Sequence, residues 1–205
     1  MTKDFAELED LFHDLEKAIF RTETHSFLFR IFPPEEGKMV LEPGCGSGKL
    51  GLAYAMGGCE VVLFDINYEA VAYARKLRGA LNSLIGFPLP VQIKVGNIHR
   101  MHFADNTFDL VFNEGVVQQW ADEGKCQGAI DQMARVSRDT VVVMANNRLY
   151  RSSSSDSVFD YSKCPTSEEL EIRLKRAGLK RVQVESVTPG EPEDSILIAG
   201  YGRKS

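Results

Sequence analysis

The feature that most constrains the fold is a strand that breaks into a loop with a glycine at every second position. The apolar run 39–43 reads as a buried strand, and Gly44, Gly46 and Gly48 follow it. Glycine has no Cβ, so such a loop turns sharply and lets the backbone approach a ligand closely. The segment 49–56 has a helical pattern, whose free N–H groups and positive dipole end would face that ligand. The sequence therefore predicts a strand–loop–helix unit that holds a nucleotide-like cofactor.

The spacing of the glycines separates the possible ligands. A phosphate-binding P-loop requires Gly-x4-Gly-Lys-Ser/Thr, but the position five residues before Gly48 is Pro43, and a leucine follows Lys49. The dinucleotide fingerprint Gly-x-Gly-x-x-Gly, counted from Gly44, would place its third glycine at position 49, which is lysine. What remains is acid-x-Gly-x-Gly-x-Gly beginning at Glu42. Alone, a glycine-rich loop of this kind is weak evidence for any one cofactor.

A carboxylate at the end of the next predicted strand adds a second signal. The apolar run 59–64 ends in Asp65, and a helix-patterned stretch follows from about 67 to 81. An acid at this point commonly accepts hydrogen bonds from the ribose hydroxyls of an adenosyl group. The alternative is that Asp65 caps the next helix, because aspartate favours that position. The two roles are compatible. Only ribose binding explains why Asp65 stands at this separation in the sequence from the glycine loop.

Two further segments complete a pattern across residues 39–113. A third predicted strand over 90–98 contains Asn97 and Ile98 at its end, and the segment 101–113 leads into a strand with a Phe-Asp-Leu-Val core. In order and spacing, these segments resemble class I S-adenosylmethionine-dependent methyltransferases of the small-molecule type. The side chain of Asn97, where the family usually has aspartate, would accept a hydrogen bond from the adenine amine. The resemblance implies these cofactor-binding residues: Glu42, Gly44, Cys45, Gly46, Gly48, Asp65, Ile66, Asn97, Ile98 and Asn113.

The rest of the chain predicts the remainder of the fold. A helix over about 127–138 precedes an apolar strand at 140–145, and a helix with capping chemistry ends near Gly178. The last strands, 181–187 and 195–201, have no helix between them, so we expect them to pair antiparallel. The resemblance implies an α/β fold: a doubly wound, seven-stranded, mostly parallel sheet with an antiparallel C-terminal strand, in a three-layer α/β/α arrangement.

The length of 205 residues fits one methyltransferase domain over 38–205, preceded by an N-terminal helical cap segment over 1–37. In related methyltransferases such a segment helps to cover the active site. Here it carries an apolar stripe at helical spacing, which favours packing over substrate contact. The stripe consists of Leu8, Leu11, Phe12, Leu15, Ala18 and Ile19.

Composition bears on partners and compartment. The chain has 24 basic and 29 acidic residues and a net charge of −5, whereas nucleic-acid binders usually carry a basic face. We therefore expect a small-molecule acceptor and no nucleic acid. Neither a signal peptide nor a long apolar span is evident, so the expectation is a cytoplasmic protein without a membrane partner. The four cysteines lack metal-ligand or redox spacing, which suits reduced thiols. The sequence does not indicate an oligomeric state.

Candidates for acceptor binding lie mainly after the fourth predicted strand, beyond Asn113, whose region in the family contacts the methionine part of the cofactor. Glu114 is the weak candidate for a catalytic residue: it would orient a nucleophile, take its proton or attract a cationic one. A plain surface role for Glu114 is equally open. Gln118, Trp120 and His25 are weak substrate candidates, with a structural wedge as the alternative for Trp120 and an exposed or capping histidine as the alternative for His25.

The implied chemistry does not require a catalytic base. S-adenosylmethionine carries an electrophilic methyl group, so alignment of the nucleophile supplies most of the catalysis, and S-adenosylhomocysteine is the product. No metal is expected, since His99 and His102 lack a companion carboxylate arrangement. Two alternatives stay open: an NAD-dependent oxidoreductase, which shares the strand–glycine–helix–acid plan, and a non-catalytic S-adenosylmethionine-binding subunit.

Overall fold

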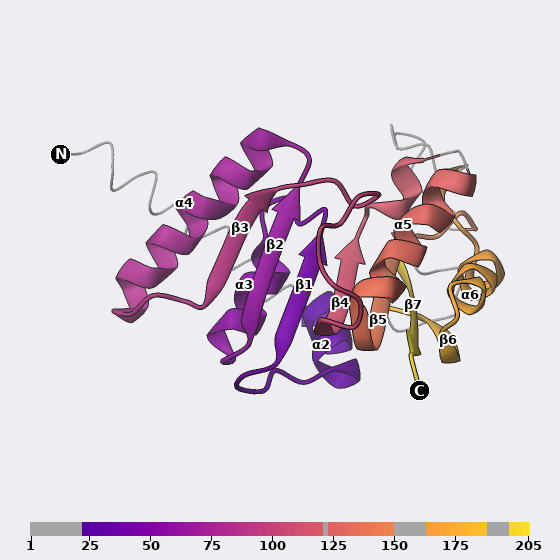
Figure 1. Ribbon diagram of the computed structural model, residues 1–205, viewed down its shortest axis with the longest axis horizontal. Coiled ribbons are helices and arrows are strands. Elements are labelled where there is room, and N and C mark those ends of the chain that lie inside the picture. The colour runs from indigo at the N-terminus through magenta and orange to yellow at the C-terminus, as the bar shows by residue number, and fades with distance from the viewer. Residues whose placement is uncertain (1–21, 121–122, 150–162, 188–196) are drawn as a thin grey trace. The chain divides into compact units, whose positions relative to one another are not determined.

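The computed structural model describes residues 22–120, 123–149, 163–187 and 197–205 (Figure 1). The chain divides into two compact units, Met1–Asn97 and Ile98–Ser205, each with its own strands and helices. The first 21 residues, and with them most of the expected cap segment, lie outside the described residues. In the described ranges, no helix has both the length and the apolar character that a bilayer crossing requires.

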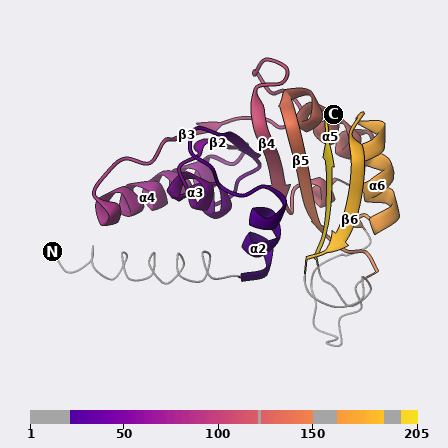
Figure 2. The ribbon, with the colours of Figure 1, turned by 90° about the horizontal axis from the view of Figure 1, so that it is seen from below.

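The first unit contains three parallel strands and three described helices. β1 pairs with β2, and β2 pairs with β3, all in the same direction. Figure 2 shows α3 and α4 on the same side of these strands. The elements are α2 (Thr22–Ile31), β1 (Met39–Pro43), α3 (Lys49–Met56), β2 (Glu60–Asp65), α4 (Tyr68–Ile85) and β3 (Val91–Val95).

The helix ends of the first unit follow from local chemistry. The side chain of Asn67 accepts a hydrogen bond from the Glu69 N–H at 2.9 Å and begins α4. Gly86 ends the same helix in the left-handed conformation, at φ 81°. The hydroxyl of Tyr54 in α3 lies 2.9 Å from the Phe32 carbonyl oxygen, to which it donates. This bond holds the chain just beyond α2 against α3.

The second unit contains four strands and three described helical segments. β4 and β5 are parallel, while β7 runs antiparallel to β5 on one side and to β6 on the other. The antiparallel C-terminal strand predicted from the sequence is therefore confirmed. The elements are β4 (Phe108–Glu114), the 3-10 helix η1 (Val117–Gln119), α5 (Glu123–Val136), β5 (Ser137–Asn146), α6 (Ser167–Arg176), β6 (Lys180–Ser186) and β7 (Leu197–Arg203).

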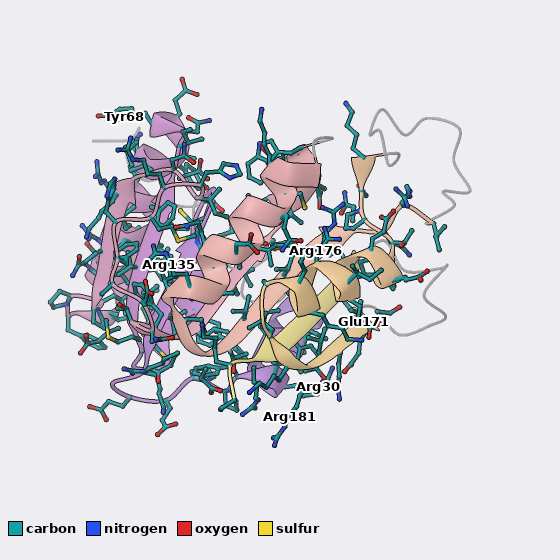
Figure 3. All side chains as sticks on the ribbon, turned by 45° about the vertical axis from the view of Figure 1, so that its right-hand side comes forward. Arg30, Tyr68, Arg135, Glu171, Arg176 and Arg181 are labelled. Atoms are coloured by element: carbon teal, nitrogen blue, oxygen red, sulfur yellow. The ribbon has the colours of Figure 1, made fainter. Side chains whose placement is uncertain are left out.

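Helices α5 and α6 pack against each other over the strands of this unit (Figure 3). The close approach of α6 requires Gly200 in β7, because a Cβ there would lie 2.6 Å from Leu174 Cδ1 and 2.9 Å from Leu170 Cγ. A capping box begins α6, in which Thr166 and Glu169 each bind the other's backbone N–H. The two units together hold the seven strands of the predicted sheet.

One helix differs from its predicted position. The sequence pattern placed it over about 127–138, but α5 begins at Glu123 and ends at Val136, and β5 begins at the next residue, Ser137. The helix therefore passes into the strand without an intervening loop. No glycine or proline marks that junction in the sequence, which is why the pattern placed the strand three residues too late, at Thr140.

Candidate functional site

The glycine loop between β1 and α3 has the backbone conformation that its sequence predicts. Gly44, Gly46 and Gly48 have φ values of 72°, 52° and 72°, all in the left-handed region that side chains disfavour. The N–H groups of Gly44 and Cys45 both donate to the Phe64 carbonyl oxygen, at 2.8 and 3.0 Å. The loop is thereby fastened to the end of β2.

The glycines of the loop serve different purposes. A Cβ on Gly46 would have no atom within 4 Å, so this residue presents bare backbone to open space. A Cβ on Gly48 would lie 2.7 Å from Leu63 Cδ1 in β2, so Gly48 allows close packing beneath the loop. Of these two glycines, Gly46 is the one with room for a ligand directly against its backbone.

Asp65 connects the glycine loop to the next helix. Its Oδ2 accepts from the Gly46 N–H at 2.9 Å, and its Oδ1 accepts from the Asn67 N–H at 2.9 Å. The N-cap of α4 is Asn67 rather than Asp65. Because each carboxylate oxygen has two lone pairs, the half-exposed Asp65 keeps acceptor capacity for two ligand hydroxyls.

Glu42 and Gly51 form a buried contact under the loop. Glu42 is 4% exposed, and its Oε2 accepts from the Gly51 N–H at 2.9 Å. A Cβ on Gly51 would lie 2.3 Å from Leu63 Cδ2 and 2.7 Å from Glu42 Oε2. Glu42 thus holds the first turn of α3 against β1 through this hydrogen bond.

The sequence reasoning missed Gly51. Counted from Gly46 rather than Gly44, the dinucleotide fingerprint is complete, with Gly48 second and Gly51 third. The fingerprint fails at Lys49 in the frame that begins at Gly44 and is satisfied in the frame that begins at Gly46. The fingerprint therefore does not by itself distinguish a dinucleotide from S-adenosylmethionine.

The thiol of Cys45 is buried within the loop. Burial raises the pKa of Cys45 well above its ordinary value, and the nearby carboxylates of Glu42 and Asp65 raise it further. The thiol consequently stays protonated in the folded protein and has no nucleophilic character near neutral pH.

Exposed apolar side chains flank Asp65 at the carboxyl ends of β2 and β3. Ile66 is 70% exposed and Val95 is 52% exposed, and the register pairs Val95 with Asp65. Asn97 is also exposed and ends the first unit. Apolar surface beside a carboxylate and an amide suits the flat face and polar edge of a purine with its ribose.

In the second unit, Arg135 of α5 fixes the loop that follows Ile98. Its guanidinium donates to the carbonyl oxygens of Met101 and Phe103, both at 2.8 Å, and pairs with Asp105 at 2.7 Å. Ile98 itself is buried.

Trp120 lies at the end of η1 against the same loop. Its ring meets that of His99 edge-on, with centroids 4.6 Å apart, and the indole is half-buried. This packing gives the indole a structural contact, and its role in substrate binding stays a prediction.

The polar residues at the end of β4 and in η1 point in different directions. Asn113 is fully buried, and its amide donates to the Met133 sulfur of α5 at 3.1 Å. Its amide nitrogen therefore contacts α5, while its buried Oδ1 has no hydrogen-bond partner among the described residues. Gln118 is 8% exposed and accepts from the Asn146 N–H at 2.8 Å, which joins η1 to the end of β5. Glu114 is half-buried at the end of β4.

His25 lies in α2, and its side chain is outside the described residues. Among the residues that the structure describes, no group of three or more His, Cys, Asp or Glu side chains is placed to hold a metal ion.

Comparison with known proteins gives a family match. A family model described as "Methyltransferase domain" matches residues 34–180. Malonyl-[acyl-carrier protein] O-methyltransferase from Pectobacterium atrosepticum is 28% identical over 116 residues, which are 57% of this chain and 41% of that protein. The same-named protein from Enterobacter lignolyticus is 28% identical over 106 residues, 52% of this chain and 37% of its own. The chain spans less than half the length of these curated relatives.

Solved structures share the fold. A SAM-dependent methyltransferase from Aquifex aeolicus has a TM-score of 0.69 at 17% identity, covering 98% of both chains. Magnesium protoporphyrin IX methyltransferase (ChlM) from Synechocystis PCC 6803, with bound SAM, has a TM-score of 0.67 at 12% identity, covering 95% of this chain and 84% of its own. The [4+2]-cyclase SpnF has a TM-score of 0.70 at 15% identity, covering 88% and 79%. The predicted seven-stranded α/β fold is confirmed.

Proposed function

Since this chain belongs to the methyltransferase domain family, we propose that it binds S-adenosylmethionine and transfers a methyl group to a nucleophile on a small-molecule acceptor, releasing S-adenosylhomocysteine. One observation carries the proposal. The open backbone of Gly46 and the carboxylate of Asp65 are joined by a 2.9 Å hydrogen bond, so bare backbone and free acceptor lone pairs lie side by side. That combination is what an adenosyl group requires.

The residues of the first unit fit this cofactor part by part. Asp65 would accept from the ribose hydroxyls, and Ile66 would cover one face of the adenine. Asn97 would accept from the adenine amine with its side-chain carbonyl. The resemblance to the family also assigns Ile98 and Asn113 to the cofactor, an assignment that stays a prediction.

The bound cofactor would supply an electrophilic methyl group on its sulfonium. The chain's own task is then to align the acceptor nucleophile and keep water out, which supplies on the order of 7–11 kcal/mol of a barrier. Glu114, at the end of β4, is the residue we assign to orienting that nucleophile or holding its proton. A base of that kind accelerates the reaction about 10²–10⁴-fold, which is less than alignment of the nucleophile contributes.

Calorimetric titration with S-adenosylhomocysteine tests the proposal. Asp65→Ala removes the acceptor of two ribose hydrogen bonds, each worth about 1.5–3 kcal/mol when charge-assisted. It also releases the Gly46 N–H. We expect affinity to fall at least about tenfold. Asp139→Ala, which removes the partner of Arg203 in the second unit, is the matched control and should bind like the wild type. Unchanged affinity in Asp65→Ala would refute the ribose assignment.

An NAD-dependent oxidoreductase is the second candidate, and the complete fingerprint ending at Gly51 favours it. Against it stands β7, which runs antiparallel between β5 and β6. Thermal shift separates the two: the midpoint should rise with S-adenosylhomocysteine and stay constant with NADH.

The third candidate, a non-catalytic binding subunit, stays open because the [4+2]-cyclase SpnF shares the fold at a TM-score of 0.70. Fold alone therefore does not fix the reaction. Release of S-adenosylhomocysteine in the presence of a panel of O, N and S nucleophiles would establish turnover. If the chain binds the cofactor but releases no S-adenosylhomocysteine with any acceptor of the panel, the result would favour this candidate.

We further propose a cytoplasmic location and no nucleic-acid partner. All four cysteines are free and buried, which suits a reducing compartment. The net charge of −5 repels nucleic acid. Binding of a labelled duplex in low salt would contradict the second point.

A further inference from the structure

Two stretches of this chain carry charge of a single sign. Residues 4–16 contain six carboxylates and no lysine or arginine, while residues 70–104 contain five lysines and arginines and no carboxylate. Blocks of like charge repel internally and often act as interaction segments. The two blocks have opposite signs, so each is a potential partner for the other.

Residues 70–97 of the basic block belong to the first unit, where α4 packs along β3 (Figure 1). The guanidinium of Arg75 donates to the Ile93 carbonyl oxygen, and that of Arg78 to the Val91 carbonyl oxygen, both at 3.0 Å. These bonds fix two cations along the outer edge of β3. Lys76 is exposed on α4 beside them. Within the described ranges, none of Arg75, Lys76 and Arg78 pairs with a carboxylate.

Exposed apolar side chains lie on the same helix, on the turn after it and on the same strand as these cations. Tyr68 and Leu84, near the two ends of α4, are 68% and 61% exposed. Phe87, in the turn after α4, is 59% exposed, and Val95 at the end of β3 is 52% exposed. These are four of the eight large apolar side chains that are exposed in the described part of the chain. Cations among exposed apolar groups suit a partner that is both acidic and apolar.

We propose that the acidic segment 4–19 of the same chain binds the basic α4 surface, made up of Arg75, Lys76 and Arg78 with the exposed apolar groups of α4 and of the turn after it. The segment carries the six carboxylates and the apolar stripe described above, with Leu8, Leu11 and Phe12 in its middle. The surface therefore meets both kinds of group that the segment presents.

Length and connection support this occupant. A 16-residue segment in helical form is about 24 Å long, close to the roughly 27 Å of the 18-residue α4. The segment is joined by residues 20–21 to α2, and α2 lies on the same side of the strands of this unit as α4 (Figure 2). This location differs from the cover over the active site that the family resemblance implies. It does not depend on the proposed function.

Zero-length carbodiimide cross-linking of the full chain, followed by mass spectrometry, tests the proposal. In low salt we expect carboxylates of residues 4–16 to couple to Lys76. Salt near 1 M, which shortens the screening length to about 3 Å, should reduce that product about tenfold. Arg75→Glu keeps Lys76 reactive but reverses the neighbouring charge, and should reduce the product similarly. The matched control is Arg176→Glu, which alters an equally exposed arginine on α6 and should leave the product unchanged.

The outcomes are distinct. Cross-links from residues 4–16 that avoid Lys76, or that spread over all exposed lysines regardless of salt, overturn the proposal. A mixture of ¹⁵N-labelled and unlabelled chains identifies a second copy as the occupant: a product containing both masses would overturn the same-chain assignment. Arg75→Gln keeps an amide donor for the Ile93 carbonyl and serves as the second variant if Arg75→Glu melts at a lower temperature.

Discussion

Alanine at Gly46 and alanine at Gly51 should lower stability by similar amounts but differ in their effect on cofactor binding, although the two residues stand five positions apart in one loop–helix unit. Gly46 has a φ of 52° and open space where a Cβ would lie. Gly51 is inside α3, and a Cβ there would overlap Leu63 Cδ2 at 2.3 Å and Glu42 Oε2 at 2.7 Å. One glycine thus faces the proposed ligand and the other faces the core.

The magnitudes follow from these contacts. For Gly46→Ala, the left-handed conformation costs about 1–2 kcal/mol of folding free energy. For a chain of this size each kcal/mol lowers the melting midpoint by about 2–4 °C. The added methyl group also occupies the space of the ligand, so affinity for S-adenosylhomocysteine should fall by well over tenfold, more than about 1.4 kcal/mol.

For Gly51→Ala the energies have another origin. Overpacking against Leu63 and Glu42 costs about 1–3 kcal/mol, while replacing a helical glycine returns up to about 1 kcal/mol. The net loss of stability is up to about 2 kcal/mol, similar to that of Gly46→Ala. Affinity should change by less than about threefold, because no new atom enters the ligand side of the loop.

Thermal melting and calorimetric titration with S-adenosylhomocysteine, run on both variants, provide the comparison. The two midpoints should fall by similar amounts while the two affinities separate by about tenfold or more. If Gly46→Ala binds like the wild type, or if Gly51→Ala loses more affinity than Gly46→Ala, the assignment of open and packed glycines is wrong.

Two further predictions concern Cys45 and Glu114. Because burial, Glu42 and Asp65 raise the pKa of Cys45 in the folded state, its contribution to stability is complete below the unfolded thiol pKa of about 8.5 and declines as pH rises above it. The melting midpoint of the wild type should therefore fall more between about pH 8 and 10 than that of Cys45→Ala, and equal slopes would contradict the burial of this thiol. Glu114→Gln should keep wild-type affinity for S-adenosylhomocysteine and lower turnover on the true acceptor about 10²-fold or more; full turnover would place Glu114 among purely structural residues.

The segment around the glycine loop was the most predictable part of the fold. The helix expected over 49–56 is α3, Lys49–Met56. Its start is set by Gly48, whose left-handed conformation no ordinary residue adopts cheaply, and the strand before it begins with three apolar residues, 39–41. Such signals depend only on residues that are close in the sequence, so they can be recognised without knowing the tertiary contacts.

Directions of side chains were less predictable. Gln118 was expected to contact an acceptor and Asn113 the cofactor, yet Gln118 accepts a backbone N–H from Asn146, and the amide of Asn113 contacts Met133. A polar residue near the end of a strand signals that some partner exists. Whether that partner is a ligand or the protein's own backbone depends on tertiary contacts, which spacing does not encode.

The glycine pattern itself illustrates why topology decides more than the motif. The series from Gly46 to Gly51 satisfies the dinucleotide fingerprint as well as the methyltransferase pattern, because both need one open glycine and one close helix–strand contact. Gly46 and Gly51 supply those two features in either case. What separates the two cofactor classes lies more than a hundred residues away, in the reversal of β7 between β5 and β6. A loop of this kind therefore identifies where an adenosyl group binds, and the strands that follow indicate which chemistry that group brings.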